Sequence, residues 1–189
     1  MSESSPVDAG RFSAWLDAIQ EVIRDEGTSD VPCGSCTACC TSSQFIHIAP
    51  DEEETLARVP RALLFPAPRL PAGHVLMGYD RHGHCPMLVD GACSIYEHRP
   101  RTCRTYDCRV FAASGLALEG PEKSAINERV SRWRFQLPEE SDRARLEAVR
   151  TAAALLGDLE PERSVTDRSL AAIGIHDRFL SRTPDPDEA

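Results

Sequence analysis

The sequence predicts an α+β fold in which a small β ribbon packs against helices from both ends of the chain. The longer helical patterns lie at the two ends, whereas short alternating and turn-rich segments lie in the middle. All eight cysteines fall within that middle part, between residues 33 and 108. The cysteine-cluster region is therefore predicted over residues 31–112, with flanking helices of the same domain in 1–30 and 113–182, and a disordered tail over 183–189.

The N-terminal helix is predicted over residues 8–26. Large apolar side chains recur there at helical spacing, with charged residues between them, and Gly27 follows as a stop signal. The residues that form this stripe are Phe12, Trp15, Leu16, Ile19, Val22 and Ile23.

Short strands and turns are predicted through the middle of the chain. QFIHI, residues 44–48, alternates as a half-buried strand does, and PDEEETLARVP after it is typical of a short helix. Residues 60–73 contain four prolines and are predicted to be a loop. From residue 74 to 96, turns at His82-Gly83 and Asp90-Gly91 predict a β ribbon, and Pro100 suits the first turn of a further short helix.

Three helices are predicted in the C-terminal part, over residues 122–135, 139–156 and 165–180. Gly157 would end the second, while Ser164 and Asp167 would cap the third.

Composition excludes several classes of function. The net charge is −9, with 20 arginines and a single lysine, Lys123, which argues against a nucleic-acid binder. No apolar run approaches the about 20 residues of a membrane span, and the first residues lack the features of a secretory signal. We therefore expect a cytoplasmic protein that binds neither nucleic acid nor membrane, and a protein partner is left open.

The cysteines form two groups whose spacing indicates metal ligation. Two-residue gaps between thiols let one turn aim several sulfurs at a single centre, as in zinc sites and iron–sulfur clusters. Cytoplasmic thiols are kept reduced, so metal binding is preferred over a disulfide framework, a redox pair or buried apolar thiols. The candidate metal ligands are Cys33, Cys36, Cys39 and Cys40 upstream, and Cys85, Cys93, Cys103 and Cys108 downstream.

CGSCTACC followed by CPMLVDGACSIYEHRPRTCR resembles a cysteine-cluster family whose signature is CxxCxxCC and a later CPxL, CxIYxxRPxxCR segment. The resemblance covers residues 33–108 and implies a zinc- or iron-chelating domain whose ligands include seven of the eight thiols, with Cys108 at the edge of the signature. Related domains occur in larger proteins such as flagellin lysine methylases, where an iron–sulfur cluster is held. The β ribbon is accordingly expected to be metal-organised.

The spacing of Cys33, Cys36 and Cys39 favours an iron–sulfur cluster, and zinc remains the alternative cofactor. Function is accordingly predicted as metal binding. The alternatives are a zinc-stabilised interaction module and an enzyme or enzyme accessory for protein modification, so catalysis is left open. Because neighbouring side chains diverge, Cys39 is predicted to join the upstream centre and Cys40 the downstream thiols.

Other polar residues near the thiols are assigned supporting roles. Histidines are expected at the surface or behind the ligands, with His84 as the best spare ligand. Arginines around Cys103 and Cys108 are expected to offset the charge of a thiolate site or to solvate a helix surface, and docking of an acidic partner is the alternative. These residues are His47, His82, His84 and His98, and Arg99, Arg101, Arg104 and Arg109.

Overall fold

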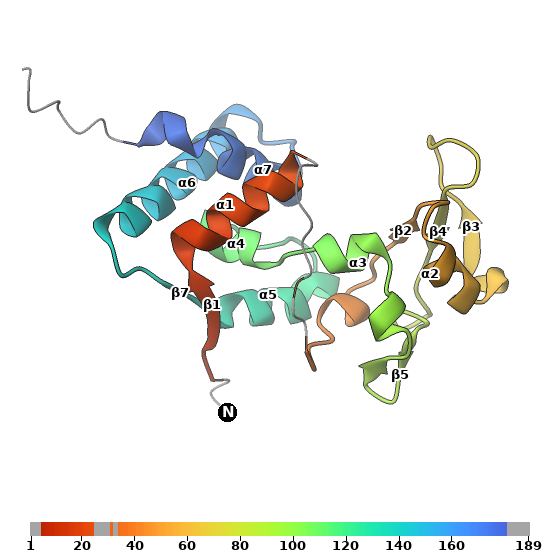
Figure 1. The fold of residues 1–189 in the computed structure, drawn as a ribbon. Coiled ribbons are helices and arrows are strands. Elements are labelled where there is room, and N and C mark those ends of the chain that lie inside the picture. The colour runs from red at the N-terminus through yellow and green to blue at the C-terminus, as the bar shows by residue number, and fades with distance from the viewer. Residues whose placement is uncertain (1–4, 25–30, 32–33, 181–189) are drawn as a thin grey trace, which may run out of the picture. The chain divides into compact units, whose positions relative to one another are not determined.

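The computed structural model describes residues 5–24, 31 and 34–180. Helices lie towards both ends of the chain and small sheets between them, which confirms the α+β prediction (Figure 1). The end of the first helix at Gly27, the thiol of Cys33 and the predicted tail over 183–189 lie outside the described residues. Among the helices that are described, none combines the length and the apolar character needed to cross a bilayer.

The chain divides into two compact units, each built from separated stretches of sequence. The first unit comprises residues 1–27, 108–118 and 130–189, and the second comprises 28–107 and 119–129. The predicted limits of the cysteine-cluster region, 31–112, stay a prediction.

In the first unit, strand β1 (Val7–Arg11) pairs in parallel with β7 (Trp133–Gln136) and runs directly into helix α1 (Phe12–Ile23). The predicted helix over 8–26 is therefore wrong for residues 8–11, which are drawn into the sheet by their pairing with β7. Gly10, with a φ of 82°, marks the irregularity in this strand. Likewise the predicted helix over 122–135 stops early: α5 (Ser124–Arg132) ends where β7 begins.

Three further helices complete the first unit: α4 (Arg109–Ser114), α6 (Glu140–Leu159) and α7 (Val165–Ile175), with a 3₁₀ turn over His176–Phe179. Ser164 caps α7 by accepting the N–H of Asp167 at 3.1 Å, as predicted. Gly157, predicted to end the second C-terminal helix, lies inside α6, because a single glycine weakens a helix without breaking it.

Helix α6 begins at a capping box in which Asp142 is fully buried. Its carboxylate accepts the backbone N–H groups of Ser13 and Glu139, both at 3.1 Å, and pairs with Arg11. These interactions, with Ser13 contributing most, lower the pKa of Asp142 to about 2. The carboxylate thus ties the start of α6 to the start of α1.

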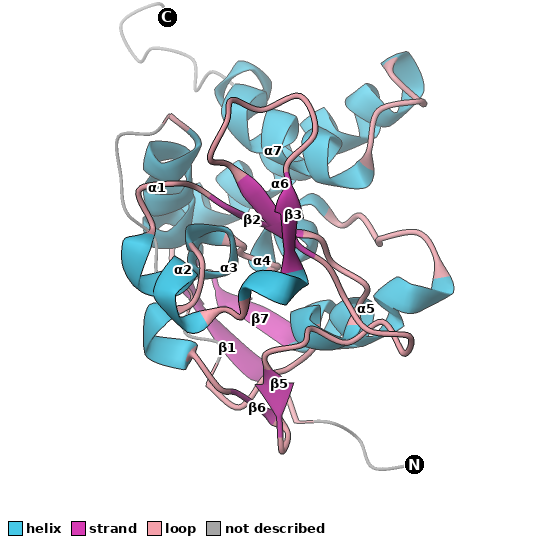
Figure 2. Cartoon of the chain, turned by 90° about the vertical axis from the view of Figure 1, so that its right-hand side faces the viewer, coloured by secondary structure: helices cyan, strands magenta, loops and turns pink. Residues whose placement is uncertain are grey.

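The second unit contains a three-stranded antiparallel sheet of order β2-β4-β3 (Figure 2). Its strands are β2 (Ile46–Ile48), β3 (Leu64–Pro66) and β4 (Val75–Met77), and the predicted short helix is α2 (Glu53–Arg58). The predicted loop over 60–73 is wrong in part, because it holds a 3₁₀ turn at Arg61–Leu63 and then β3. Pro66 is tolerated there because β3 is an edge strand.

The predicted β ribbon is shorter than expected. Strand β4 pairs with β2 and β3 instead of with a strand after the His82-Gly83 turn, so the ribbon is reduced to β5 (Leu88–Val89) and β6 (Ala92–Cys93) around Asp90-Gly91. Helix α3 (Arg101–Thr105) follows Pro100, as predicted. The core of this unit consists of Ile46, Ile48, Val59, Met77, Met87 and Ile95.

Candidate metal centre

The second unit holds six of the seven cysteines that the structure describes. They are Cys36, Cys39, Cys40, Cys85, Cys93 and Cys103, whereas Cys108 belongs to the first unit. All seven are half-buried, and no disulfide joins any two of them. The upstream and downstream groups thus share one unit, apart from Cys108.

The upstream thiols lie on a tight turn. Cys39–Thr41 forms a single 3₁₀ turn, and the carbonyl of Ala38 accepts both the N–H of Thr41 at 3.3 Å and the hydroxyl of Ser42 at 2.6 Å. Ser42, at the end of the turn, is completely buried. In such a turn successive side chains diverge, so Cys39 and Cys40 leave the backbone in different directions.

Lys123 is hydrogen-bonded to this turn although it lies 81 residues after Ser42 in the sequence. Its Nζ donates a hydrogen bond to the carbonyl oxygen of Ser42 at 2.8 Å. The chain's single lysine thereby joins the short segment 119–129 to the cysteine turn of the same unit. In the sequence this residue stands out only as the single lysine, which predicts no contact with the cysteine turn.

Backbone hydrogen bonds bring the two cysteine groups side by side. The N–H of Cys85 donates to the carbonyl of Cys40 at 2.7 Å, and the N–H of Ser43 donates to the carbonyl of Gly83 at 2.9 Å. The chain after the upstream turn therefore runs along the loop that carries the first downstream thiol.

The downstream thiols converge on the apolar core of this unit. Cys85, Cys93 and Cys103 all pack against the cluster formed by Ile46, Ile48, Val59, Met77, Met87 and Ile95. Cys93 lies opposite Leu88 in the β5–β6 hairpin, and the N–H of Cys103 donates to the carbonyl of Pro100 at 2.8 Å. Three of the downstream thiols thus pack against one apolar wall, the core cluster, without forming a group that could hold a metal ion among the described residues.

The pKa of Cys85 shows how this wall affects a thiol. Burial raises the pKa of Cys85, and the neighbouring Cys93 raises it further. The backbone N–H groups of Met87 and Leu88 act in the opposite direction, because hydrogen bonds to a thiolate favour the charged form. A bound cation would reverse the balance, since it stabilises thiolates far more strongly than burial penalises them.

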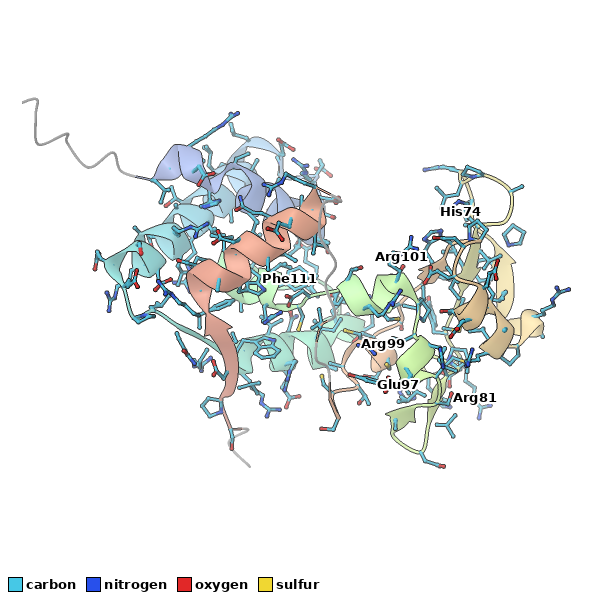
Figure 3. The ribbon with its side chains drawn as sticks, viewed as in Figure 1. His74, Arg81, Glu97, Arg99, Arg101 and Phe111 are labelled. Atoms are coloured by element: carbon cyan, nitrogen blue, oxygen red, sulfur yellow. The ribbon has the colours of Figure 1, made fainter. Side chains whose placement is uncertain are left out.

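Most histidines and arginines near the thiols are held by other side chains or by backbone groups. His98 Nδ1 lies 2.7 Å from a carboxylate oxygen of Glu54, and His47 Nε2 lies 2.9 Å from Nδ1 of His74. Arg101 pairs with Asp51 at 2.6 Å. Figure 3 labels two of these side chains, His74 and Arg101.

Arg99 is the most deeply placed cation of the unit. It is 7% exposed, its guanidinium carbon lies 4.0 Å from the ring centre of Tyr96, and its Nη1 donates to the Tyr96 carbonyl. The fixed guanidinium places positive charge four residues before Cys103, which suits a site that gathers thiolates.

Cys108 has a different environment. The indole N–H of Trp133 donates to Cys108 Sγ at 3.2 Å, and the guanidinium of Arg109 lies 5.8 Å from the Trp133 ring centre. Trp133 was not identified from the sequence, where it was assigned to the end of a helix.

The donor set fits a thiophilic metal, because it consists of reduced, half-buried thiols beside an apolar wall. No three Cys, His, Asp or Glu side chains of the described part of the chain are grouped closely enough to hold a metal ion. The thiol of Cys33 lies outside that part.

A model of the CxxCxxCC family, described as "Putative zinc- or iron-chelating domain", matches residues 32–127, just over half of the chain. The match begins one residue before the first cysteine of the upstream group and extends past Lys123. No curated protein and no solved structure matches the chain.

Proposed function

Because the chain belongs to the CxxCxxCC family of zinc- or iron-chelating domains, we propose that it binds iron as an iron–sulfur cluster held by cysteine thiolates. The observation that carries the proposal is the backbone hydrogen bond from the N–H of Cys85 to the carbonyl of Cys40, which joins the CxxCxxCC turn to the CPxL loop. Such a cluster would supply one-electron transfer or a structural cross-link at this joint.

The proposed ligands fall into two sets. Cys33, Cys36 and Cys39 are assigned to an upstream centre because of their spacing. Cys40 is assigned to the downstream thiols Cys85, Cys93 and Cys103. The backbone hydrogen bond that the carbonyl of Cys40 accepts from the N–H of Cys85 supports this division. The ligand role of Cys108 stays a prediction.

The surroundings of the downstream thiols support a redox centre. An apolar wall and N–H groups directed at a sulfur are two of the features that set the potential of iron–sulfur clusters. Cys85 packs against the core cluster, and the backbone N–H groups of Met87 and Leu88 lower the pKa of its thiol.

Structural zinc is the second candidate, and one observation favours it. The strands of the second unit are only two or three residues long, so backbone pairing alone gives this unit little stability. A tetrahedral zinc site would supply folding free energy directly. We place either form of the protein in the cytoplasm, where thiols stay reduced.

Anaerobic purification from iron-replete cells tests the proposal. We expect brown protein with stoichiometric iron and acid-labile sulfide, and thiol trapping under denaturing, non-reducing conditions should find no disulfides. Cys85→Ser should lower the iron content, and the iron content of Cys108→Ser, measured beside it, tests whether Cys108 is a ligand. Stoichiometric zinc without acid-labile sulfide would contradict the iron–sulfur proposal, and intact disulfides in fresh lysate would contradict metal binding by the thiols.

A further inference from the structure

Three aromatic side chains form an exposed cluster on the sheet of the second unit. Phe45, Phe65 and Tyr79 are 56%, 40% and 42% exposed. Their rings nevertheless contact one another: the ring centres of Phe45 and Phe65 are 6.1 Å apart, and those of Phe45 and Tyr79 are 5.1 Å apart. We call these three residues the aromatic face.

Two residues of the aromatic face, Phe45 and Phe65, lie on the side of the sheet that turns away from the core, and Tyr79 follows the end of β4. Ile46 and Leu64 both pair with Met77 and pack in the core cluster, so Phe45 and Phe65, their chain neighbours, point to the opposite side. Gly78 lies beside both rings, since a Cβ there would be in ordinary van der Waals contact with them, 3.6 Å from the Phe65 ring and 3.7 Å from the Phe45 ring. Exposed aromatic rings therefore lie on the side of the sheet opposite to the core.

A cluster of aromatic rings exposed to water costs free energy in a protein that has no binding partner. Single exposed apolar residues are common, but contiguous apolar patches mark binding surfaces, and aromatic residues dominate the centres of protein interfaces. Phe45, Phe65 and Tyr79 come from three separate stretches of the chain, yet they pack as one patch. The arrangement indicates a surface built for contact.

The stretch of chain that carries Phe65 and Tyr79 has a charge opposite to that of the whole chain. Residues 59–89 contain three arginines, three histidines and a single acidic residue, Asp80, whereas the chain has a net charge of −9. The carboxylate of Asp80 is engaged in the turn after Tyr79, where it accepts the N–H groups of His82 and His84 at 2.8 and 2.9 Å. Arg81, labelled in Figure 3, is exposed on the same turn.

We propose that the aromatic face binds an acidic segment of a partner protein, which places an apolar side chain against Phe45, Phe65 and Tyr79 and its carboxylates near the arginines of residues 59–89. A second copy of this chain is a poor occupant, because two identical basic borders would repel each other. Nucleic acid is disfavoured as well. The rings meet at 90° and 53° instead of forming the parallel stacking platform on which bases of single-stranded nucleic acid pack.

A short turn connects the aromatic face to a candidate metal ligand. The turn at residues 80–84 leads from Tyr79 directly to Cys85, and the N–H of Ser43 bonds to the carbonyl of Gly83 in that turn. A partner on the aromatic face would therefore be held beside the loop that carries a candidate ligand. The inference does not depend on which metal is bound.

Selection from a library of random peptides displayed on phage tests the proposal with the full-length, metal-loaded protein as bait. We expect enrichment of acidic peptides with an aromatic or large aliphatic anchor. Synthetic copies of these peptides should bind the Phe45→Ser, Tyr79→Ser double variant at least about tenfold more weakly, the loss expected when interface anchors are removed. Leu159→Ser removes a side chain that is 67% exposed on α6 and should leave binding unchanged. Metal content, measured on each variant, separates loss of docking from loss of the metal centre.

A charge-reversed variant completes the test. Arg81→Glu should weaken binding of the same peptides, and added salt should weaken binding to the wild-type protein more than to this variant. Three results would overturn the proposal: enriched peptides that are basic or uncharged, equal binding to the double variant, or tighter binding of single-stranded RNA than of any selected peptide.

Discussion

Lys123→Met is expected to loosen the cysteine turn without touching a cysteine. The substitution keeps the length of the side chain but removes the donor that satisfies the carbonyl of the buried Ser42. Leaving a buried carbonyl without its charged donor costs about 1–2 kcal/mol, with Lys123 only half-buried and partly screened by solvent. Because 1.4 kcal/mol is a factor of ten, local opening of the turn should become roughly five- to thirtyfold more frequent.

Amide hydrogen exchange measures this opening directly. The N–H groups of Cys85 and Ser43, which bond across the joint between the two cysteine groups, should exchange faster by that factor in Lys123→Met. Metal release to a chelator should accelerate in the same variant. Lys123→Arg, which retains a positive donor, should restore much of the protection. Unchanged exchange at both amides, or an arginine variant as loose as the methionine variant, would refute the reasoning.

Three further outcomes are expected. Ile48→Ala removes three fully buried carbons from the core against which the downstream thiols pack, and it should lower the free energy of unfolding by ~3–4 kcal/mol. Denaturant unfolding should show this as a lower midpoint at an unchanged slope. A loss below about 1 kcal/mol, the value of one buried methylene, would mean that this core is not closely packed. Cys39→Ser and Cys40→Ser should give different metal stoichiometries or spectra, and identical defects would place both thiols on one centre. The pKa of Asp142 is lowered from 3.8 to about 2, so its carboxylate stabilises the fold above about pH 4 and ceases to do so as the pH falls towards 2. Urea midpoints of the wild-type protein and of Asp142→Asn should therefore differ most near neutral pH and approach each other at the acid end, and a constant difference would contradict this assignment.

Local patterns predicted the elements whose causes are local. The helix after Ser164, the short helix over Glu53–Arg58 and the turn at Asp90-Gly91 are set by a cap, by acidic residues in a first turn and by a residue pair that accepts positive φ. The family was predictable for the same reason, since the cysteine spacing that marks it is local, whereas the ligand assignments stay a prediction.

Long-range pairing explains what the sequence did not reveal. Residues 8–11 and 133–136 carry patterns that suit a helix, and each becomes a strand only because the other is there to pair with it. Strand β3 was not predicted, because residues 60–73 contain four prolines. Pairing with β4 leaves β3 at the edge of the sheet, where Pro66 is tolerated. The hydrogen bond from Lys123 to Ser42 likewise depends on two segments far apart in the chain, so no short motif announces it.

The parallel pairing of Val7 with Trp133 also orders events during synthesis of the protein. A ribosome adds roughly 5–20 residues per second, so β1 waits on the order of ten seconds before its partner strand exists. During that interval every cysteine is synthesised, and the apolar side of α1, with Phe12, Leu16 and Ile19, lacks the helix α6 that later packs beside it. The order of synthesis therefore produces the whole cysteine-bearing segment, residues 33–108, before the N-terminal helix can complete its packing.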